Sequence, residues 1–218
     1  MFFPYRDDNP RVLYPYVTFS IIGLNIAIFL GQFLIIGGNH QLSRELVFSF
    51  GFIPADFNPL TIFTSMFMHG GIAHIIGNMW FLYIFGDNIE SILGHLKYFI
   101  FYLACGLGAA LIQFFVDPGS QIPMVGASGA IAGILGAYMI RFPKARVHVL
   151  AVIIVFITTF VVPAQIVLGL WFLMQLSNGL GSLGVNTTGG VAWFAHIGGF
   201  ITGVTTLSYF QKFRIEKI

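Results

Sequence analysis

Long apolar stretches with very few charges dominate this sequence and decide the solvent in which it can fold. Six of them cover residues 16–36, 74–85 with its flanks, 98–116, 128–140, 147–179 and 193–210. A helix needs about 20 such residues to cross a bilayer. Only 8% of the residues are charged, whereas soluble domains carry about 25%. These features exclude a soluble enzyme, a disordered chain and a coiled coil, and they predict an all-α membrane protein.

The number of spans depends on the stretch 147–179, which Pro163 divides. It forms either two short spans, or one span at about 164–179 with 147–162 lying at the interface or extending that helix. Basic residues collect on the cytoplasmic side of membranes. With six spans and a cytoplasmic N-terminus, nine of the ten Lys and Arg residues lie on that side, and Arg44 is the exception. Seven spans would move three C-terminal basic residues outside.

We therefore predict a six-transmembrane-helix bundle over residues 16–210. A cytoplasmic N-terminal segment, 1–15, precedes it, and a cytoplasmic tail, 211–218, follows it. Residues 1–15 are polar with no secretory cleavage pattern after the first apolar stretch, so that stretch is expected to stay in the membrane. The lack of a transit-like segment favours a prokaryotic plasma membrane. Neither a cofactor nor a nucleic-acid partner is expected, and the oligomeric state stays open.

Polar side chains inside apolar spans mark candidate functional positions, because lipid does not satisfy them. His74 and Asn78 are four residues apart and share one helix face, after His69 at the span entrance. An interfacial histidine and helix–helix hydrogen bonds are the plain alternative. No metal is expected, because His69 and His74 do not share a helix face and no His is followed by Glu.

A second candidate position is Ser128, within Gly126-Ala127-Ser128-Gly129 at the start of a Gly- and Ala-rich helix. Close helix packing alone accounts for such small residues. A hydroxyl at a helix N-terminus, however, also lies beside free backbone N–H groups that can hold a developing oxyanion.

A third candidate position is His196, one turn before the G-x-x-x-G ridge of Gly199 and Gly203. Such a ridge lets a neighbouring helix approach closely. We expect the ridge to face the small residues Gly129, Gly133 and Gly136. With six spans, Ser128, His196 and His74 all lie in the outer half of the membrane, whereas seven spans would put His196 in the opposite leaflet.

Taken together, these motifs make the sequence similar to the rhomboid family of intramembrane serine proteases. The similarity rests on G-x-S-G at 126–129, H-x-x-x-N at 74–78 after His69, and A-H-x-x-G-x-x-x-G at 195–203, in family order over nearly the whole chain. The resemblance implies a six-helix core, Ser128 as nucleophile and His196 as general base. It also implies an oxyanion hole formed by His74, Asn78 and the Ser128 backbone N–H.

The sequence departs from some family members at two places. Residues 59–61 read Pro-Leu-Thr where those members have Trp-Arg, and Ala132 stands where they place a Tyr against the catalytic imidazole. None of the eight carboxylates lies in the helices of Ser128 or His196. Asp117 is the only plausible third member of a triad, so a Ser-His dyad is favoured.

Several functional alternatives remain. A catalytically silent rhomboid-like protein that binds membrane clients is the main one, and a small channel or transporter is another. An aspartyl protease is excluded because Asp87 stands alone at a span end. The substrates implied are transmembrane proteins whose spans contain weak helix formers near the outer interface. The connection 37–64 resembles the family's membrane-embedded first loop. The Gly-rich segment 179–190 is either a lid or a plain connector.

Overall fold

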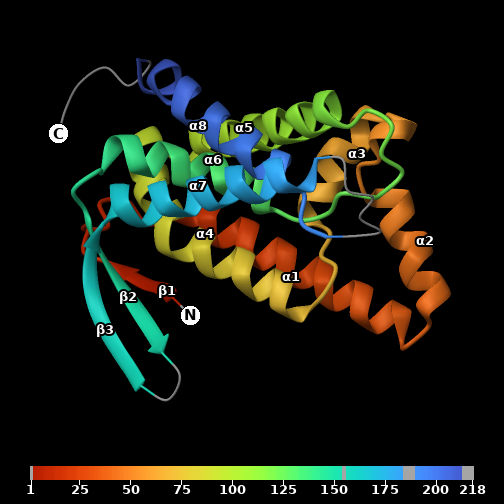
Figure 1. Ribbon diagram of the computed structural model, residues 1–218, viewed down its shortest axis with the longest axis horizontal. Coiled ribbons are helices and arrows are strands. Elements are labelled where there is room, and N and C mark those ends of the chain that lie inside the picture. The colour runs from red at the N-terminus through yellow and green to blue at the C-terminus, as the bar shows by residue number, and fades with distance from the viewer. Residues whose placement is uncertain (1, 154–155, 184–189, 213–218) are drawn as a thin grey trace.

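The computed structural model describes residues 2–153, 156–183 and 190–212. In chain order the elements are β1 (Phe2–Asp7), α1 (Tyr16–Ile36), α2 (His40–Phe50), η1 (Pro54–Asp56), α3 (Pro59–Thr64), η2 (Ser65–Phe67), α4 (Ile72–Leu93), α5 (His95–Val116), α6 (Ser128–Arg141), β2 (Arg146–Ile153), β3 (Phe156–Pro163), α7 (Ala164–Ser182) and α8 (Trp193–Lys212). The long helices form one bundle, and a small sheet projects from one end of it (Figure 1).

The helical membrane bundle predicted from the sequence is confirmed. Helices α1, α4, α5, α6, α7 and α8 lie within or over the six predicted apolar stretches. By length and hydropathy, α1 and α5 are each able to cross a membrane, and the chain from α3 to α4, bent by 90°, is a third candidate. Within the described residues this test therefore counts two or three crossings, and six crossings stay a prediction.

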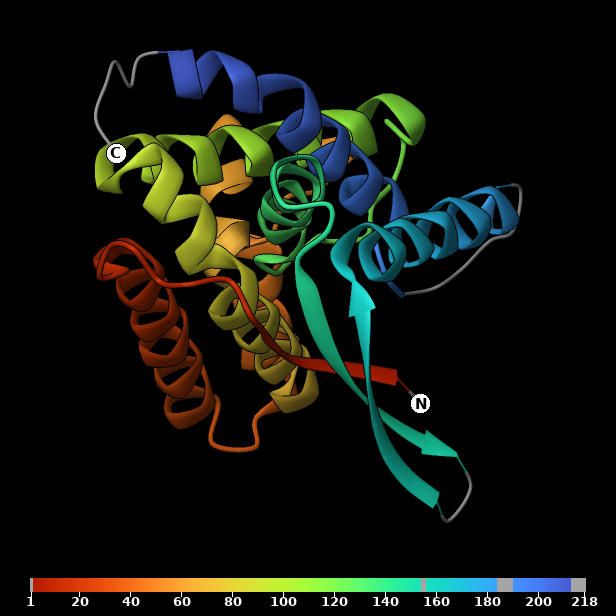
Figure 2. The same cartoon turned by 90° about the vertical axis from the view of Figure 1, so that its left-hand side faces the viewer.

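The segment 147–162 does not extend the following helix, which was one of the two forms that we expected, and its position at the membrane interface stays a prediction. It forms the hairpin of β2 and β3, and β1 pairs antiparallel with β2 to complete a three-stranded sheet. Val147, Val149 and Ala151 are buried while their neighbours are less so, which is the two-residue alternation of a strand. Its β-branched residues also favour strands. The hairpin extends beyond the helices when the molecule is seen from that end (Figure 2).

Helix α6 lies at the centre of the bundle, surrounded by longer helices (Figure 2). Every residue from Gly129 to Tyr138 is buried. The small residues of α6 let α8 approach to backbone contact: a Cβ added at Gly199 would lie 1.9 Å from the Gly129 carbonyl oxygen, and one at Gly203 equally close to that of Gly133. The Gly199 and Gly203 ridge of α8 therefore packs on the glycines of α6, as the sequence predicted.

The connection 37–64 is folded and holds the segment that precedes α6. Phe52 and Met124 exchange two backbone hydrogen bonds of 3.0 and 2.8 Å. The Gly126 amide donates to the Ser65 carbonyl oxygen at 2.8 Å. These bonds fix the chain that leads into Ser128.

Candidate active site

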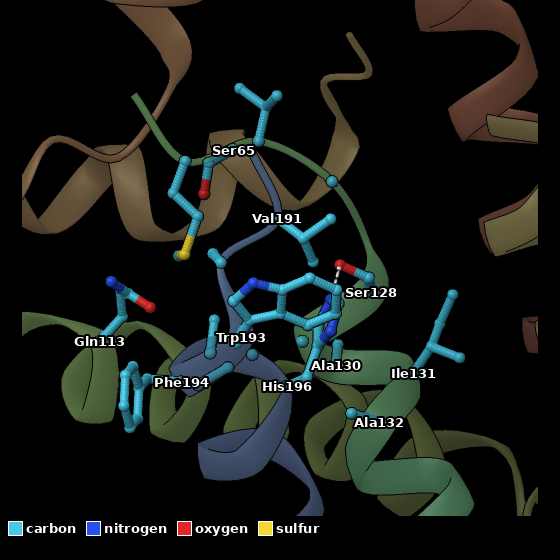
Figure 3. Close-up of a pocket in the computed structure, with 18 of the residues that line it drawn as sticks. Ser65, Gln113, Ser128, Ala130, Ile131, Ala132, Val191, Trp193, Phe194 and His196 are labelled. Atoms are coloured by element: carbon cyan, nitrogen blue, oxygen red, sulfur yellow. Dashed lines mark hydrogen bonds between the residues drawn. The ribbon is translucent and has the colours of Figure 1, made fainter. Parts of the chain in front are cut away.

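Ser128 and His196 lie side by side, although 68 residues separate them in the chain. Ser128 is the first residue of α6 and His196 lies in the first turn of α8. The Ser128 Oγ is 2.8 Å from His196 Nε2, and both side chains are partly buried (Figure 3). The backbone contacts of α8 with α6 bring the two helix starts together, so a hydroxyl and an imidazole share one hydrogen bond.

Gly126 determines how closely the histidine of α4 approaches this pair. Its φ of +122° is a conformation that residues with a side chain rarely adopt. A Cβ added there would lie 2.6 Å from His74 Nε2 and 3.5 Å from Asn78 Nδ2. Both polar groups of α4 therefore lie against the backbone two residues before Ser128. Gly126 acts at a loop rather than on a helix ridge.

His69 completes the polar cluster around α4. The Asn78 Nδ2 donates a hydrogen bond of 3.0 Å to His69 Nε2, and both residues are buried. The His69 and His74 rings meet edge to face, with centroids 5.1 Å apart. An amide nitrogen carries two hydrogens, so Asn78 retains one donor for a ligand. The sequence predicted His74 and Asn78 here but assigned no role to His69.

The other side of His196 is covered by α7 and by the start of α8. The His196 Nδ1 is 2.8 Å from the Gln175 side-chain oxygen, and Gln175 is buried. The Trp171 ring lies tilted beside the imidazole at 5.9 Å, and the Trp193 ring lies edge-on at 6.4 Å. Figure 3 shows the Trp193 indole beside the Ser128–His196 pair. Sequence reasoning missed all three residues.

Asp117, the candidate third member of a triad, does not take that position. It follows the end of α5 and lines the same cavity, but the acceptor that faces His196 Nδ1 is the side-chain oxygen of Gln175. In the described part of the chain, no three His, Cys, Asp or Glu side chains gather as metal ligands.

The Ser128–His196 pair opens into a cavity of about 1060 Å³ that lies among α4, α5, α6, α7 and α8. Its wall includes the candidate groups His74, Asn78, Ser128 and His196, together with apolar side chains such as Trp171. The volume is at the upper end of ligand-site sizes, about 300–1,000 Å³. Half of the expected lid, 179–190, lies outside the described residues, at 184–189, while Ser182, Leu183 and Gly190 line the cavity.

Comparisons with known proteins agree with these motifs. The Rhomboid domain family profile matches residues 57–213. The chain is 26% identical over 224 residues to "Rhomboid protein 1, mitochondrial" of Saccharomyces cerevisiae, an alignment that covers 99% of this chain and 58% of that protein. It is 28% identical over 127 residues to "Putative rhomboid protease YdcA" of Bacillus subtilis, covering 58% of this chain and 62% of that one.

The match to "Rhomboid protease GluP" of Bacillus subtilis is 32% identical over 132 residues and covers 57% of this chain and 24% of that protein. In each of these three pairs the alignment spans less than two thirds of the relative's length.

Proposed function

The chain belongs to the rhomboid family, and on that premise we propose that it is an intramembrane serine endopeptidase. It hydrolyses peptide bonds in or near transmembrane segments of other membrane proteins with a Ser128–His196 dyad. The observation that carries the proposal is the 2.8 Å hydrogen bond between Ser128 Oγ and His196 Nε2 within an open cavity. A serine needs such a base, because its hydroxyl is a weak nucleophile until a base removes the proton.

The first half-reaction forms an acyl-enzyme. The Ser128 Oγ attacks the scissile carbonyl carbon while His196 Nε2 accepts the hydroxyl proton. The tetrahedral intermediate places its negative oxygen beside the donors of the oxyanion hole, namely Asn78 Nδ2, His74 and the backbone N–H of Ser128. Collapse of the intermediate breaks the C–N bond, and the imidazolium returns its proton to the leaving amine.

The second half-reaction releases the other product. Water attacks the ester carbonyl while His196 takes one of its protons. As the ester C–O bond breaks, the imidazolium gives that proton to Ser128 Oγ, which regenerates the hydroxyl and releases the carboxylic acid product. The cavity supports this step because its wall mixes polar and apolar groups, so water can remain inside an otherwise apolar bundle. One oxyanion donor lowers the activation barrier by roughly 3–4 kcal/mol in comparable hydrolases.

The substrate class follows from the position of the pair inside a helical membrane bundle. A peptide bond in a stable helix has its carbonyl hydrogen-bonded and its backbone shielded, so substrate spans must unwind locally. Gly, Pro and other weak helix formers near the interface lower that cost. We propose that both termini lie on the cytoplasmic side, and that residues 16–210 are the membrane domain. The prokaryotic plasma membrane stays a prediction, because the relatives' names include mitochondrial as well as bacterial proteins.

The test measures cleavage and labelling with the purified chain in detergent or liposomes. The wild type should cut a labelled substrate whose transmembrane span contains Gly near its outer end, and a fluorophosphonate should label it. Ser128→Ala should abolish both activities, and His196→Ala should abolish cleavage. Labelling that persists undiminished in His196→Ala would show that another group is the base.

The alternative is a catalytically silent relative that binds membrane clients. The hydrogen bond between Ser128 and His196 argues against it, because a client-binding role does not need that pair. A wild type that binds the substrate span but neither cuts it nor reacts with the fluorophosphonate would favour the alternative.

A further inference from the structure

The candidate dyad continues into a third side chain on a third helix. Gln175 of α7 has its Oε1 2.8 Å from His196 Nδ1, and His196 Nε2 is in turn 2.8 Å from Ser128 Oγ. Only 3% of Gln175 is exposed. Two hydrogen bonds thus connect an amide of α7, an imidazole of α8 and a hydroxyl of α6 in sequence.

The direction of the first hydrogen bond follows from its chemistry. An amide oxygen only accepts hydrogen bonds, so His196 Nδ1 must carry the proton that it donates to Gln175. A neutral imidazole has one N–H, which leaves the Nε2 lone pair facing the Ser128 hydroxyl. This is the tautomer that a general base needs. The opposite tautomer would set two lone pairs against each other at Gln175 Oε1 and His196 Nδ1, and it would leave Nε2 unable to accept the Ser128 proton.

The same face of α7 also restrains the imidazole ring. Trp171 and Gln175 are four residues apart, so they lie one helical turn apart on one side of α7. Trp171 lies beside the ring at 5.9 Å with an interplanar angle of 36°. On the opposing helix α6, Ala132 provides only a methyl group. Helix α7 therefore supplies both a hydrogen-bond acceptor and an aromatic neighbour for His196.

We propose that Gln175 is a positioning residue that acts through His196, so that the working unit is Ser128–His196–Gln175. The inference rests on the proposed protease function. Gln175 does the work of tautomer selection that a carboxylate does in Ser-His-Asp triads, and an Asn amide occupies that place in Cys-His-Asn proteases. A neutral amide suits the resting enzyme, because a buried carboxylate carries a large desolvation cost whenever the imidazole is neutral, and only the imidazolium would compensate it.

The experiment compares two variants of Gln175 with a matched control. Gln175→Met keeps the length of the side chain but removes the acceptor, whereas Gln175→Glu keeps an acceptor oxygen. The control is Asn25→Leu, which also removes a buried amide, but one that donates to the Ile21 carbonyl of its own helix. Cleavage kinetics, the pH profile of kcat/KM and the unfolding temperature are measured for each variant.

Loss of the acceptor should lower kcat about 10- to 100-fold in Gln175→Met with KM little changed, because a hydrogen bond to a group that becomes charged is lost. Gln175→Glu should recover most of that kcat. Its carboxylate favours the imidazolium, so the acidic limb of the pH profile should move to higher pH. The other titratable side chains on the cavity wall, His74 and Asp117, are unchanged in all variants. Asn25→Leu should keep the wild-type kcat and pH profile.

Wild-type kcat in Gln175→Met would overturn the inference, and so would an unmoved acidic limb in Gln175→Glu. If Gln175→Met does not fold, the acidic limb of the kcat/KM pH profile of Gln175→Glu is sufficient to test the inference. These results differ from failure of the proposed function, in which the wild type itself neither cuts the substrate nor reacts with the fluorophosphonate.

Discussion

Gly199 of α8 is in contact with the backbone of Gly129 in α6: a Cβ added at Gly199 would lie 1.9 Å from the Gly129 carbonyl oxygen. No side chain of any size fits at that distance. Each glycine follows one member of the candidate pair in sequence: Gly129 comes directly after Ser128, and Gly199 comes one turn after His196. The backbone contact between the helices therefore sets the distance from hydroxyl to imidazole.

The first prediction concerns Gly199→Ala. The added methyl group must push α8 away from α6, so we expect a loss of about 1–3 kcal/mol in the free energy of unfolding. Displacement of His196 should also lower kcat. Gly169→Ala on α7 is the control, because its added Cβ would meet no atom within 4 Å beyond the adjoining backbone of its own helix. Wild-type cleavage rates in Gly199→Ala would contradict the role of this contact.

The second prediction concerns the oxyanion hole. Asn78→Ala removes a donor that acts on the transition state rather than the bound substrate, so kcat should fall about 100-fold with little change in KM. Steady-state cleavage of a membrane substrate measures both constants. His69→Ala should cost less than Asn78→Ala, because it removes only the acceptor that orients the amide. Equal kcat values for Asn78→Ala and the wild type would remove Asn78 from the site.

The sequence located Ser128, His196, His74 and Asn78 through one rule, that polar groups are costly within apolar spans. The same rule applies to Gln175, which lies within the apolar helix Ala164–Ser182. A single Gln in this helix matches none of the motifs in the sequence, and its meaning depends on which helix packs beside α7. Spacing along one helix is readable from sequence, and matched glycine ridges indicated that α8 packs on α6, but no such pattern paired α7 with α8.

The hairpin of β2 and β3 was not predicted from the sequence, for a different reason. Residues 147–162 are apolar enough for an interfacial segment or a helix, and composition alone does not separate these from a strand. The alternation of Val147, Val149 and Ala151 was a signal for a strand. The partner strand β1, however, lies about 140 residues earlier, where Arg6 pairs with His148. A polar N-terminal segment gave no local sign that it would complete a sheet.

The third prediction concerns the pH dependence of stability through Asp7. Its carboxylate accepts hydrogen bonds from the Tyr138 hydroxyl and from Asn88 Nδ2, and burial raises its pKa from 3.8 to about 6. The folded state therefore binds more protons than the unfolded state between these two values. Consequently, this group makes the free energy of unfolding fall as pH rises through that window. Asp7→Asn should remove the fall and gain about 1 kcal/mol at pH 7, after discounting for partial exposure.

Asp8→Asn provides a control of opposite sign. The hydrogen bond from His148 lowers the pKa of Asp8, so its contribution to stability is present above pH 3.8 and is lost as pH falls through the lowered value. Asp8→Asn should therefore leave unchanged the fall in the free energy of unfolding that Asp7 causes as pH rises to about 6. Thermal unfolding in detergent across this range measures both variants, and a slope that survives in Asp7→Asn would assign it to another group.

The fourth prediction concerns Glu90, whose side chain is fully buried in α4. Its carboxylate accepts hydrogen bonds from the Val17 and Thr18 backbone amides at 2.9 and 2.8 Å, and from the Thr18 hydroxyl at 2.7 Å. These amides belong to the first turn of α1, where no acceptor exists within the helix. His95 Nδ1 contacts the same carboxylate at 2.6 Å. One side chain thus holds the starts of α1 and α5 against α4.

Glu90→Ala leaves the two amides and the hydroxyl of α1 without an acceptor in a buried site, so we expect a loss of about 3–5 kcal/mol in the free energy of unfolding. Glu90→Gln keeps one acceptor oxygen and should lose about 1–2 kcal/mol. The control is Glu45→Ala in α2, where an exposed carboxylate accepts a hydrogen bond from the Gln41 side chain, and its effect should stay within about 0.5 kcal/mol. Unfolding by SDS titration in mixed micelles gives the three values. If Glu90→Ala were as stable as Glu45→Ala, α1 would owe its position to apolar packing rather than to this carboxylate.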